Sequence, residues 1–404
     1  MLSTKIWAVL ILTAFILVTA LVFGIFSQQA YGDDVRDYFS RPFLNRAAEY
    51  QQKTMSLSIL QRLLTWAVLG TATFWAWKHF AGNPRPSIIT AAGYIAAFFI
   101  ILYLINLPLD FYKGFILEHR FGLSNQTWVG WLTDYLKSRG ISLLLAVPAL
   151  TGLYVLMRHF MDSWWWIAGL AWAIFIILGS YLFPVVVDPL FYQFKSLEDP
   201  AMRASIISMA EEAGIQVDDV LIADASRKTH KVNAYFTGIG KTKRIVIFDT
   251  LLTRFSRDEA LAVIAHEMAH WRFNHIGKGI ALSVITIFFA FYMLHTMFWE
   301  TNLLGDFRTI ALTLVFLTLF SFVTLPLQNT VSRHFEIQAD REAIRLTGQP
   351  YTHISLKQKL AEVNLADVQP HPLIRAILYT HPTVMERIEL ALEEAKKQPA
   401  CPGS

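Results

Sequence analysis

The sequence predicts a mainly α-helical membrane protein with about seven transmembrane helices and a small α+β segment between the fifth and sixth. Of its 404 residues, 54% are hydrophobic and only 16% are charged, and the mean hydropathy is +0.40. Soluble domains carry about a quarter charged residues, so this composition indicates an integral membrane protein. The net charge is +4 with no dense basic stripe, which argues against a nucleic-acid partner.

Seven apolar runs are long enough to cross a bilayer, which takes about 20 helical residues. The first run follows Lys5; a cleaved signal peptide is the alternative, but a run of about 20 residues favours a retained helix. The second run is short, and Met55–Arg62 can extend it if the Arg62 side chain reaches toward the interface. The predicted spans are Ile6–Phe26, Leu63–Trp77, Ile88–Leu107, Ile141–Met157, Trp164–Val187, Gly279–Trp299 and Ile310–Leu327.

The charges in the loops predict the orientation of the chain. Short loops on the N-terminal side contain fewer Lys and Arg residues than those opposite, which makes the opposite side cytoplasmic. The membrane is then the cytoplasmic membrane of a bacterium or the endoplasmic reticulum of a eukaryote. The predicted domains are a five-span region, a cytoplasmic catalytic segment, the last two spans and a C-terminal helical segment, over 1–187, 188–278, 279–330 and 331–404.

The polar segment 188–278 has its own predicted elements. Helical spacing predicts a helix that ends near Gly214, and β-rich runs predict a strand and then a hairpin. These elements cover 201–215, 217–225, and 232–238 paired with 244–252.

A capping box then predicts the start of the helix that carries the chemistry. Ser256 is an N-cap candidate and Glu259 follows three residues later. The predicted helix runs from about Arg257 to His275.

The H-E-x-x-H motif on this helix predicts a zinc hydrolase. His266 and His270 are four residues apart and so share a helix face, where they can bind one ion. Glu267 lies beside the first histidine, where it can reach a metal-bound water. Zinc lowers the pKa of that water and polarises the scissile carbonyl, while the glutamate takes the proton and later delivers it to the leaving amine.

Catalytic zinc requires a third protein ligand, which we expect on a helix from about Val331. Glu336 and Asp340 are again four residues apart. We predict Glu336 as the ligand and Asp340 as the acceptor of a hydrogen bond from a ligand histidine. An exposed acidic helix face is the alternative for this pair. His275 and His334 remain alternative ligands, although His275 turns away from the shared face.

Further motifs extend from the third loop to the tail: "EHRFGLSNQT" (118–127), "NAYFTG" (233–238), "RIVIFDTLL" (244–252), "SRHFEIQAD" (332–340) and "HPTVMER" (381–387). Together with "VIAHEMAHW" (263–271), they make the chain resemble the type I CAAX prenyl endopeptidases. These are integral-membrane zinc proteases that process prenylated C-terminal motifs.

The resemblance implies a mainly α membrane protein with about seven transmembrane helices enclosing a water-filled chamber, plus a small α+β zincin-like catalytic domain. It implies one zinc per chain at the cytoplasmic end of that chamber, with Glu267 as the catalytic base. The zinc ligands implied are His266, His270 and Glu336.

The resemblance also implies where the substrate binds. It places Asn233 on the edge strand that holds the substrate backbone, and an edge strand can align a peptide by adding it to the sheet. His381 would steady the oxyanion as a hydrogen-bond donor; an ordinary surface histidine is the alternative. Arg387 either pairs with Glu336 or a nearby acid, or is a solvated helix residue. The predicted substrate-binding residues are Asn233, Ala234 and Arg387.

The predicted function is a zinc-dependent membrane endopeptidase that cleaves near the C-terminus of peptide or protein substrates, lipidated or not. A membrane quality-control metalloprotease is the alternative, and the five spans before the metal helix favour the first. A transporter or scaffold with a vestigial site is the second alternative, disfavoured by the complete motif. The single cysteine, Cys401, excludes an intrachain disulfide, and its neighbours in "CPGS" lack the aliphatic pair of a prenylation box.

Overall fold

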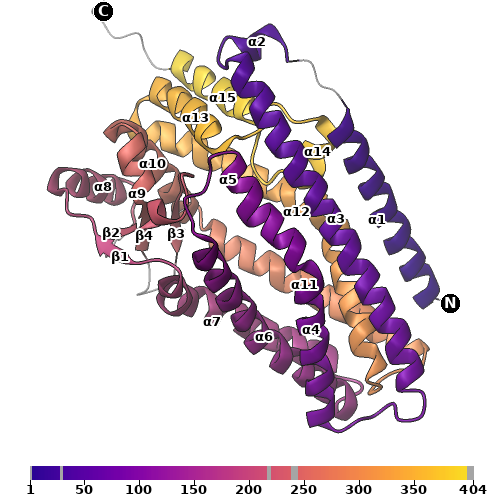
Figure 1. Ribbon diagram of the computed structural model, residues 1–404. Helices are drawn as coiled ribbons and strands as arrows, with labels where there is room; N and C mark the ends of the chain where they lie inside the picture. Colours follow the sequence, from indigo (N-terminus) through magenta and orange to yellow (C-terminus); the bar gives the residue numbers. More distant parts are fainter. Residues whose placement is uncertain (1, 28–30, 216–219, 238–243, 398–404) are drawn as a thin grey trace, which may run out of the picture.

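The computed structural model describes residues 2–27, 31–215, 220–237 and 244–397. Long helices run side by side through most of the molecule, and a small sheet with shorter helices lies toward one end (Figure 1). Within these described ranges, seven helices are long and apolar enough to cross a membrane, which confirms the seven predicted spans. They are α1 (Leu2–Phe26), α3 (Arg41–His79), α4 (Ile88–Phe111), α6 (Trp128–His159), α7 (Trp164–Leu182), α11 (His275–Glu300) and α12 (Arg308–Thr347).

Local sequence explains how these helices begin and bend. At the start of α4, the Ser87 side chain accepts a hydrogen bond from the backbone N–H of Thr90, which satisfies a donor that the first turn leaves unpaired. Pro108 lies inside α4 and cannot donate to the helix ladder. The helix continues as a wider π-helical segment, η1 (Tyr112–Leu117), before the short α5 (Glu118–Arg120).

Helix α3 is much longer than the second predicted span. Its 39 residues extend about 58 Å at 1.5 Å per residue, nearly twice the bilayer core of about 30 Å. Met55–Arg62 does extend the apolar run, as predicted. The Arg62 guanidinium packs over the Phe322 ring of α12, 4.6 Å from its centroid.

Polar side chains connect α3, α4 and α6 within the helical body. Gln61 donates to Asp110 at 2.7 Å, and the Arg139 guanidinium pairs with the same carboxylate at 2.8 Å. The three residues lie just beyond the predicted spans Leu63–Trp77, Ile88–Leu107 and Ile141–Met157. This polar contact therefore joins the three helices near the end of α4.

The described part of the chain forms a sheet of four strands in the order β1-β2-β4-β3, in which β3 is an edge. β3 and β4 pair antiparallel, which confirms the pairing expected for the predicted hairpin, and β2 runs parallel to β4. Ile245 and Ile247 pack into the core beneath the helix that carries the H-E-x-x-H motif, whereas Val246 and Phe248 face a second cluster, as strand alternation requires. The strands are β1 (Phe194–Ser196), β2 (Val220–Ala223), β3 (Ala234–Thr237) and β4 (Arg244–Phe248).

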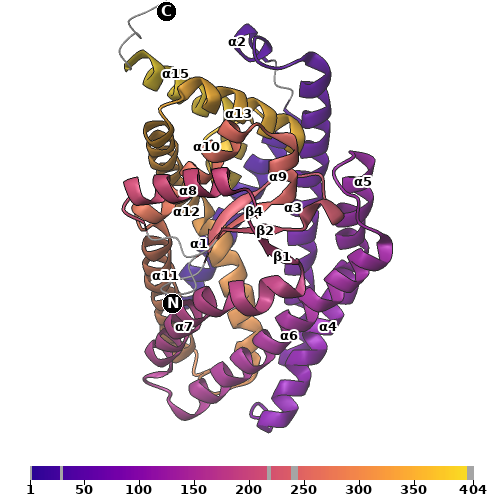
Figure 2. The ribbon, with the colours of Figure 1, turned by 90° about the vertical axis from the view of Figure 1, so that its left-hand side faces the viewer.

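Helices surround this sheet. Figure 2 shows the strands between α8 and α9 on one side and α6 and α7 on the other. α8 ends near Gly214, as predicted, and this glycine has a positive φ of 70°, a conformation that glycine adopts without strain. The helices of this segment are α8 (Pro200–Glu212), α9 (Asp249–Arg254) and α10 (Arg257–Arg272).

Two element boundaries in this segment differ from the prediction. The β-rich run 244–252 ends at Phe248, and α9 follows. Asp249 in the first turn of α9 accepts hydrogen bonds from Ser226, and an acid at that position is favoured by the helix dipole. α10 ends at Arg272, three residues early, because Asn274 adopts a left-handed conformation (φ 51°) that asparagine tolerates.

The helix that carries Glu336 does not begin at Val331; that prediction is wrong. α12 runs without a break for 40 residues, with Pro326 inside it. The change from apolar to polar sequence after Leu327 marks a change of environment, while the helix itself continues. The expected domain limit at 330 therefore falls inside this helix.

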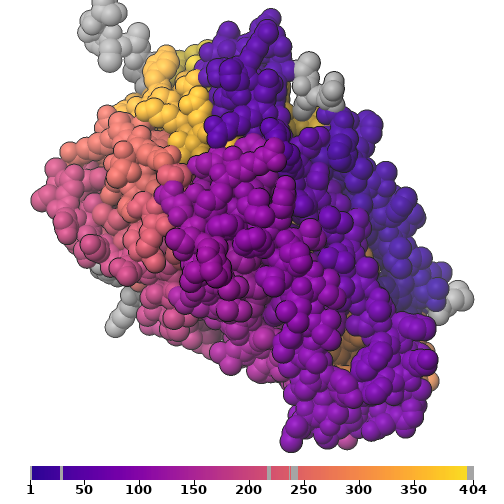
Figure 3. Space-filling model, viewed as in Figure 1, coloured from indigo at the N-terminus to yellow at the C-terminus, as the bar shows by residue number. Residues whose placement is uncertain are grey.

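The C-terminal helices cover the end of α12. α2 (Asp33–Arg36) joins them, since Val35 packs in one cluster with Met385 and Ile388. Figure 3 shows the indigo and yellow segments side by side at this end. The predicted turn 239–243 and Cys401 lie outside the described residues. The helices are α13 (Pro350–Asn364), α14 (Pro372–Leu378) and α15 (Val384–Lys397).

Candidate metal centre

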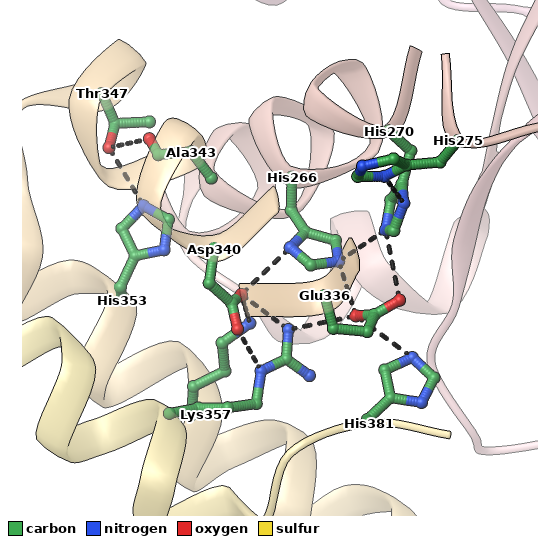
Figure 4. A network of polar contacts seen from close by, with 11 residues as sticks. His266, His270, His275, Glu336, Asp340, Ala343, Thr347, His353, Lys357 and His381 are labelled. Carbon is green, nitrogen blue, oxygen red and sulfur yellow. Dashed lines mark hydrogen bonds and ion pairs between the residues drawn. The ribbon is translucent and has the colours of Figure 1, made fainter. Parts of the chain in front are cut away.

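Two helices bring the candidate ligands together. α10 carries His266 and His270, and α12 carries Glu336 (Figure 4). The Nε2 atoms of the two histidines are 3.2 Å apart. Glu336 Oε2 lies 3.2 Å from His266 Nε2, and Oε1 lies 3.3 Å from His270 Nε2. One ligand atom from each residue lies within 4.8 Å of the others.

Small side chains allow this close approach. Ala262, Ala265 and Ala269 share one face of α10, since they are three and four residues apart. Ala339 and Ala343 lie on α12, and all five are fully buried. The separation of packed helices depends on the side chains at their contact, so alanines let the histidines of one helix reach the carboxylate of the other.

Contacts behind the ligands orient both histidines toward the centre. His266 Nδ1 lies 3.0 Å from Asp340 Oδ1. This contact is close but not a well-directed hydrogen bond within the described residues, and the carboxylate favours the tautomer with the proton on Nδ1 and a lone pair on Nε2. His270 Nδ1 lies 2.9 Å from His275 Nδ1, and His275 Nε2 lies 3.1 Å from Gln338 Oε1. An amide oxygen only accepts hydrogen bonds, so the His275 ring carries its proton on Nε2. Its Nδ1 then accepts a hydrogen bond from His270 Nδ1–H.

The residues fit a metal cation. Both Nε2 lone pairs and a carboxylate face one another at contact distance. Glu336 is 6% exposed, and its Oε2 makes no well-directed hydrogen bond within the described residues. Such a group of electron-pair donors is unfavourable without a positive charge among them. His275 and His334, the alternative ligands, lie outside the metal-binding group found among the described residues.

Two cations from separate helices hold Asp340 in place. The Arg387 guanidinium of α15 makes a bidentate contact with it, at 2.6 and 2.7 Å. Lys357 of α13 donates to the same carboxylate at 3.0 Å. Burial lowers the pKa of Lys357 and Arg387 lowers it further, while Asp340 opposes both effects. Arg387 also lies 3.9 Å from Glu336 Oε2.

Lys357 was missed from the sequence, although a signal exists. Ile354, Lys357 and Ala361 are spaced as one helix face, and all three are buried. A lysine at a buried position of an apolar face needs a partner, and here that partner is Asp340.

The remaining predicted residues surround the centre. Glu267 is half-buried on α10. His381 comes from the loop between α14 and α15, and its Nε2 lies 3.3 Å from Glu336 Oε2. Asn233 is exposed just before β3, and its carbonyl accepts from Phe248 N–H at 3.0 Å. Ala234 is the first residue of the edge strand.

Two cavities border the centre. One of about 630 Å³ extends from His275 and Phe335 along α11 and α12. The other, of about 470 Å³, begins at His381 and Arg387. Thr380 lines both. The walls that the helices give the first cavity are rich in hydroxyl and amide groups, among them Ser283, Thr286, Ser321, Thr324 and Gln328.

A multi-pass helical membrane body with an H-E-x-x-H metal centre defines a membrane metalloendopeptidase. Residues 196–395 match the model of peptidase family M48, and residues 25–193 match the CAAX prenyl protease N-terminal region with five membrane helices. The chain therefore belongs to the M48 family of CAAX prenyl proteases, which confirms the resemblance.

Relatives and a solved structure agree with this assignment. An uncharacterized metalloprotease, YhfN, of Bacillus subtilis is 31% identical, over 76% of this chain and 74% of its own. CAAX prenyl protease 1 of Saccharomyces cerevisiae is 32% identical, over 70% and 68%. The crystal structure of S. mikatae Ste24p has a TM-score of 0.81 at 25% identity, covering 96% of this chain and 98% of that one.

Proposed function

We propose that the protein is a zinc-dependent endopeptidase that cleaves its substrates near their C-terminus. The observation that carries the proposal is the convergence of two histidine Nε2 atoms and a Glu336 oxygen, with both Nδ1 atoms restrained behind them. Two imidazoles and one carboxylate are a ligand set that catalytic zinc uses. Zinc bound there would acidify a water molecule and polarise the scissile carbonyl.

The protein's own residues supply the remaining steps. Glu267, next to His266 on α10, accepts a proton from the attacking water and returns it to the leaving amine. His381 donates to the carbonyl oxygen as negative charge develops there. The free edge of β3 holds the substrate backbone through main-chain hydrogen bonds, with Asn233 and Ala234 at its start. Arg387 is proposed to contact substrate as well as Asp340.

The relatives support the substrate class. Several carry the name CAAX prenyl protease, so we propose C-terminal CAAX-type substrates. The experiment below determines whether these substrates must be prenylated. The cavity beside His275 has a mainly apolar lining that includes Trp172, Leu317 and Phe320, with hydroxyl and amide side chains among it. Such a lining accommodates a peptide together with an apolar group. The loop charges support a metal centre on the cytoplasmic side.

The test combines metal analysis with cleavage mapping. The purified full-length protein in detergent is expected to contain one zinc per chain and to lose turnover on treatment with a chelator, with recovery on zinc addition. Farnesylated and unmodified peptides of one CAAX sequence are then compared, with cut sites mapped by mass spectrometry. Absence of zinc or of cleavage contradicts the proposal. Equal cleavage of both peptides at internal sites favours the quality-control alternative.

A further inference from the structure

The smaller cavity is lined partly by residues that have no role in the proposed reaction. It lies between α3, the end of α13 and the loop before α15, and its volume of about 470 Å³ is within the range of about 300–1,000 Å³ found for ligand pockets. One end touches the metal centre through His381 and Arg387. Gln51, Asn364 and Asp367 also line it.

The edge strand begins at this cavity. The backbone N–H of Val232 donates to Asn364 Oδ1 at 3.2 Å, so the chain enters β3 beside the cavity wall. A peptide that adds to β3 in the antiparallel sense, as β4 does on the other side, runs with its C-terminal end toward Val232. Antiparallel pairing is the more stable of the two arrangements. Residues that follow the scissile bond are thereby directed to the cavity.

The second cavity leaves a separate place for the rest of the substrate. It shares Thr380 with the smaller cavity and extends along α11 and α12. His275, which contacts His270, lines it. His381, which lies near Glu336, lines the smaller cavity. A peptide held at the metal centre therefore has a cavity available for each of its flanks.

Asp367 gives the smaller cavity its charge character. Its carboxylate accepts a hydrogen bond from Gln369 N–H at 3.2 Å, and within the part of the chain that the structure describes it has no cation at ion-pair distance. Lys357 and Arg387, the cations in the same wall, are paired with Asp340. Burial raises the pKa of Asp367 to about 6, which leaves it mostly ionised above pH 7.

We infer that the smaller cavity receives the substrate segment that follows the scissile bond, and that Asp367 selects basic and neutral side chains over acidic ones in that segment. The inference rests on the proposed peptidase function. A carboxylate in a partly buried wall interacts strongly with a charge a few ångströms away, since the local dielectric constant is well below that of water.

The test measures charge preference on both sides of the cut. Peptides with an amidated C-terminus, which removes the terminal carboxylate that Asp367 would also repel, carry Lys, Gln or Glu at each of the three positions before and the three after the scissile bond, and the full-length protein is assayed for kcat/KM. Wild type should prefer Lys over Glu by about tenfold, at positions after the bond. Asp367→Asn should remove this preference, and Asp367→Lys should reverse it. Asparagine keeps the oxygen that accepts from Gln369, and metal content and thermal unfolding verify that both variants fold.

Glu362→Lys is the matched control, because Glu362 is exposed on α13 and lies outside the cavity wall. It should retain the wild-type preference. A charge preference located before the scissile bond, or one that Asp367→Lys leaves unchanged, overturns the inference while the peptidase function stands. If wild type with bound zinc cleaves none of the peptides, the proposed function fails and the inference fails with it.

Discussion

The metal centre and the edge strand are neighbours that are built in opposite ways. His266, Glu336 and Asp340 are 7%, 6% and 2% exposed, whereas Asn233 at the start of β3 is exposed. β3 packs against α10, the helix that carries the histidines. One region is closed by packing, and its neighbour is an edge strand of the described sheet, where we propose that the substrate backbone binds.

This difference in exposure corresponds to two separate proposed roles, metal binding and substrate binding. On the metal side, each oriented group has a partner on another element: Asp340 has Lys357 and Arg387, and His270 has His275. Such contacts fix the geometry before substrate arrives. On the proposed substrate side, β3 has one neighbouring strand in the described sheet, so an added peptide strand is proposed to complete its hydrogen bonding. The centre should therefore be sensitive to single side chains, and the edge should be tolerant of them.

The largest effect expected is from Glu336→Ala. The change removes the carboxylate from the three-ligand set, and two histidines alone do not make a catalytic zinc site. Bound zinc, measured by elemental analysis after dialysis, should fall to a small fraction of the wild-type content, and turnover should be lost. Full zinc retention would remove Glu336 from the ligand set and would place the third ligand elsewhere, with His334 as the next variant to measure.

Glu267→Gln should lose about 10²–10⁴-fold in kcat, the usual contribution of a general base, with zinc content unchanged. Glutamine preserves the shape of the side chain but has no basic oxygen. The comparison with Glu336→Ala separates metal binding from proton transfer within the closed region. A variant within about tenfold of wild type would mean that another group takes the proton, since a base is typically worth more than that.

Some residues of this closed region could be predicted from the sequence and others could not. His266, His270, Glu336 and Asp340 were predicted because four-residue spacing within one helix puts both members of a pair on one face. The distance between the two pairs could not be predicted, because it depends on how α10 and α12 pack. The close packing of those helices depends on alanines. In the sequence these alanines indicate only a helix, because alanine is a strong helix former.

Lys357 and His275 have contacts that could not be predicted from the sequence. Lys357 lies on a different helix from Asp340, and Lys359, two residues on, pairs instead with Glu259. His275 was predicted to turn off the ligand face of a continuous helix. The break at Asn274 re-aims it onto His270. The membrane spans were predicted more fully than these contacts, because span length and hydropathy depend on local composition. The continuity of α12 was not predicted, because the polarity of the sequence changes within the helix.

Lys357→Met should weaken zinc binding by about 10–100-fold, the usual cost of losing a group that holds a ligand's partner. The affinity is measured by competition with a chelator of known Kd. Lys359→Met is the matched control, since Lys359 is on the same helix and contacts Glu259 at 2.8 Å. It should leave zinc affinity unchanged. The loss of a cation also favours a bound metal electrostatically, so a rise in affinity in Lys357→Met would show that its charge outweighs its positioning role.

The smallest effect is expected at the open edge, from Asn233→Ala. The side chain is exposed, so its truncation should change neither zinc content nor thermal unfolding. Losing one hydrogen bond to the substrate backbone, worth about 0.5–1.5 kcal/mol net, should lower kcat/KM about two- to tenfold. Because the strand holds the peptide backbone, lipidated and unmodified peptides of the same sequence should be affected alike. A loss confined to the lipidated peptide would place Asn233 in contact with the lipid. A loss as large as that of Glu267→Gln would show that the edge is as closely constrained as the metal centre, and the contrast between the two regions would fail.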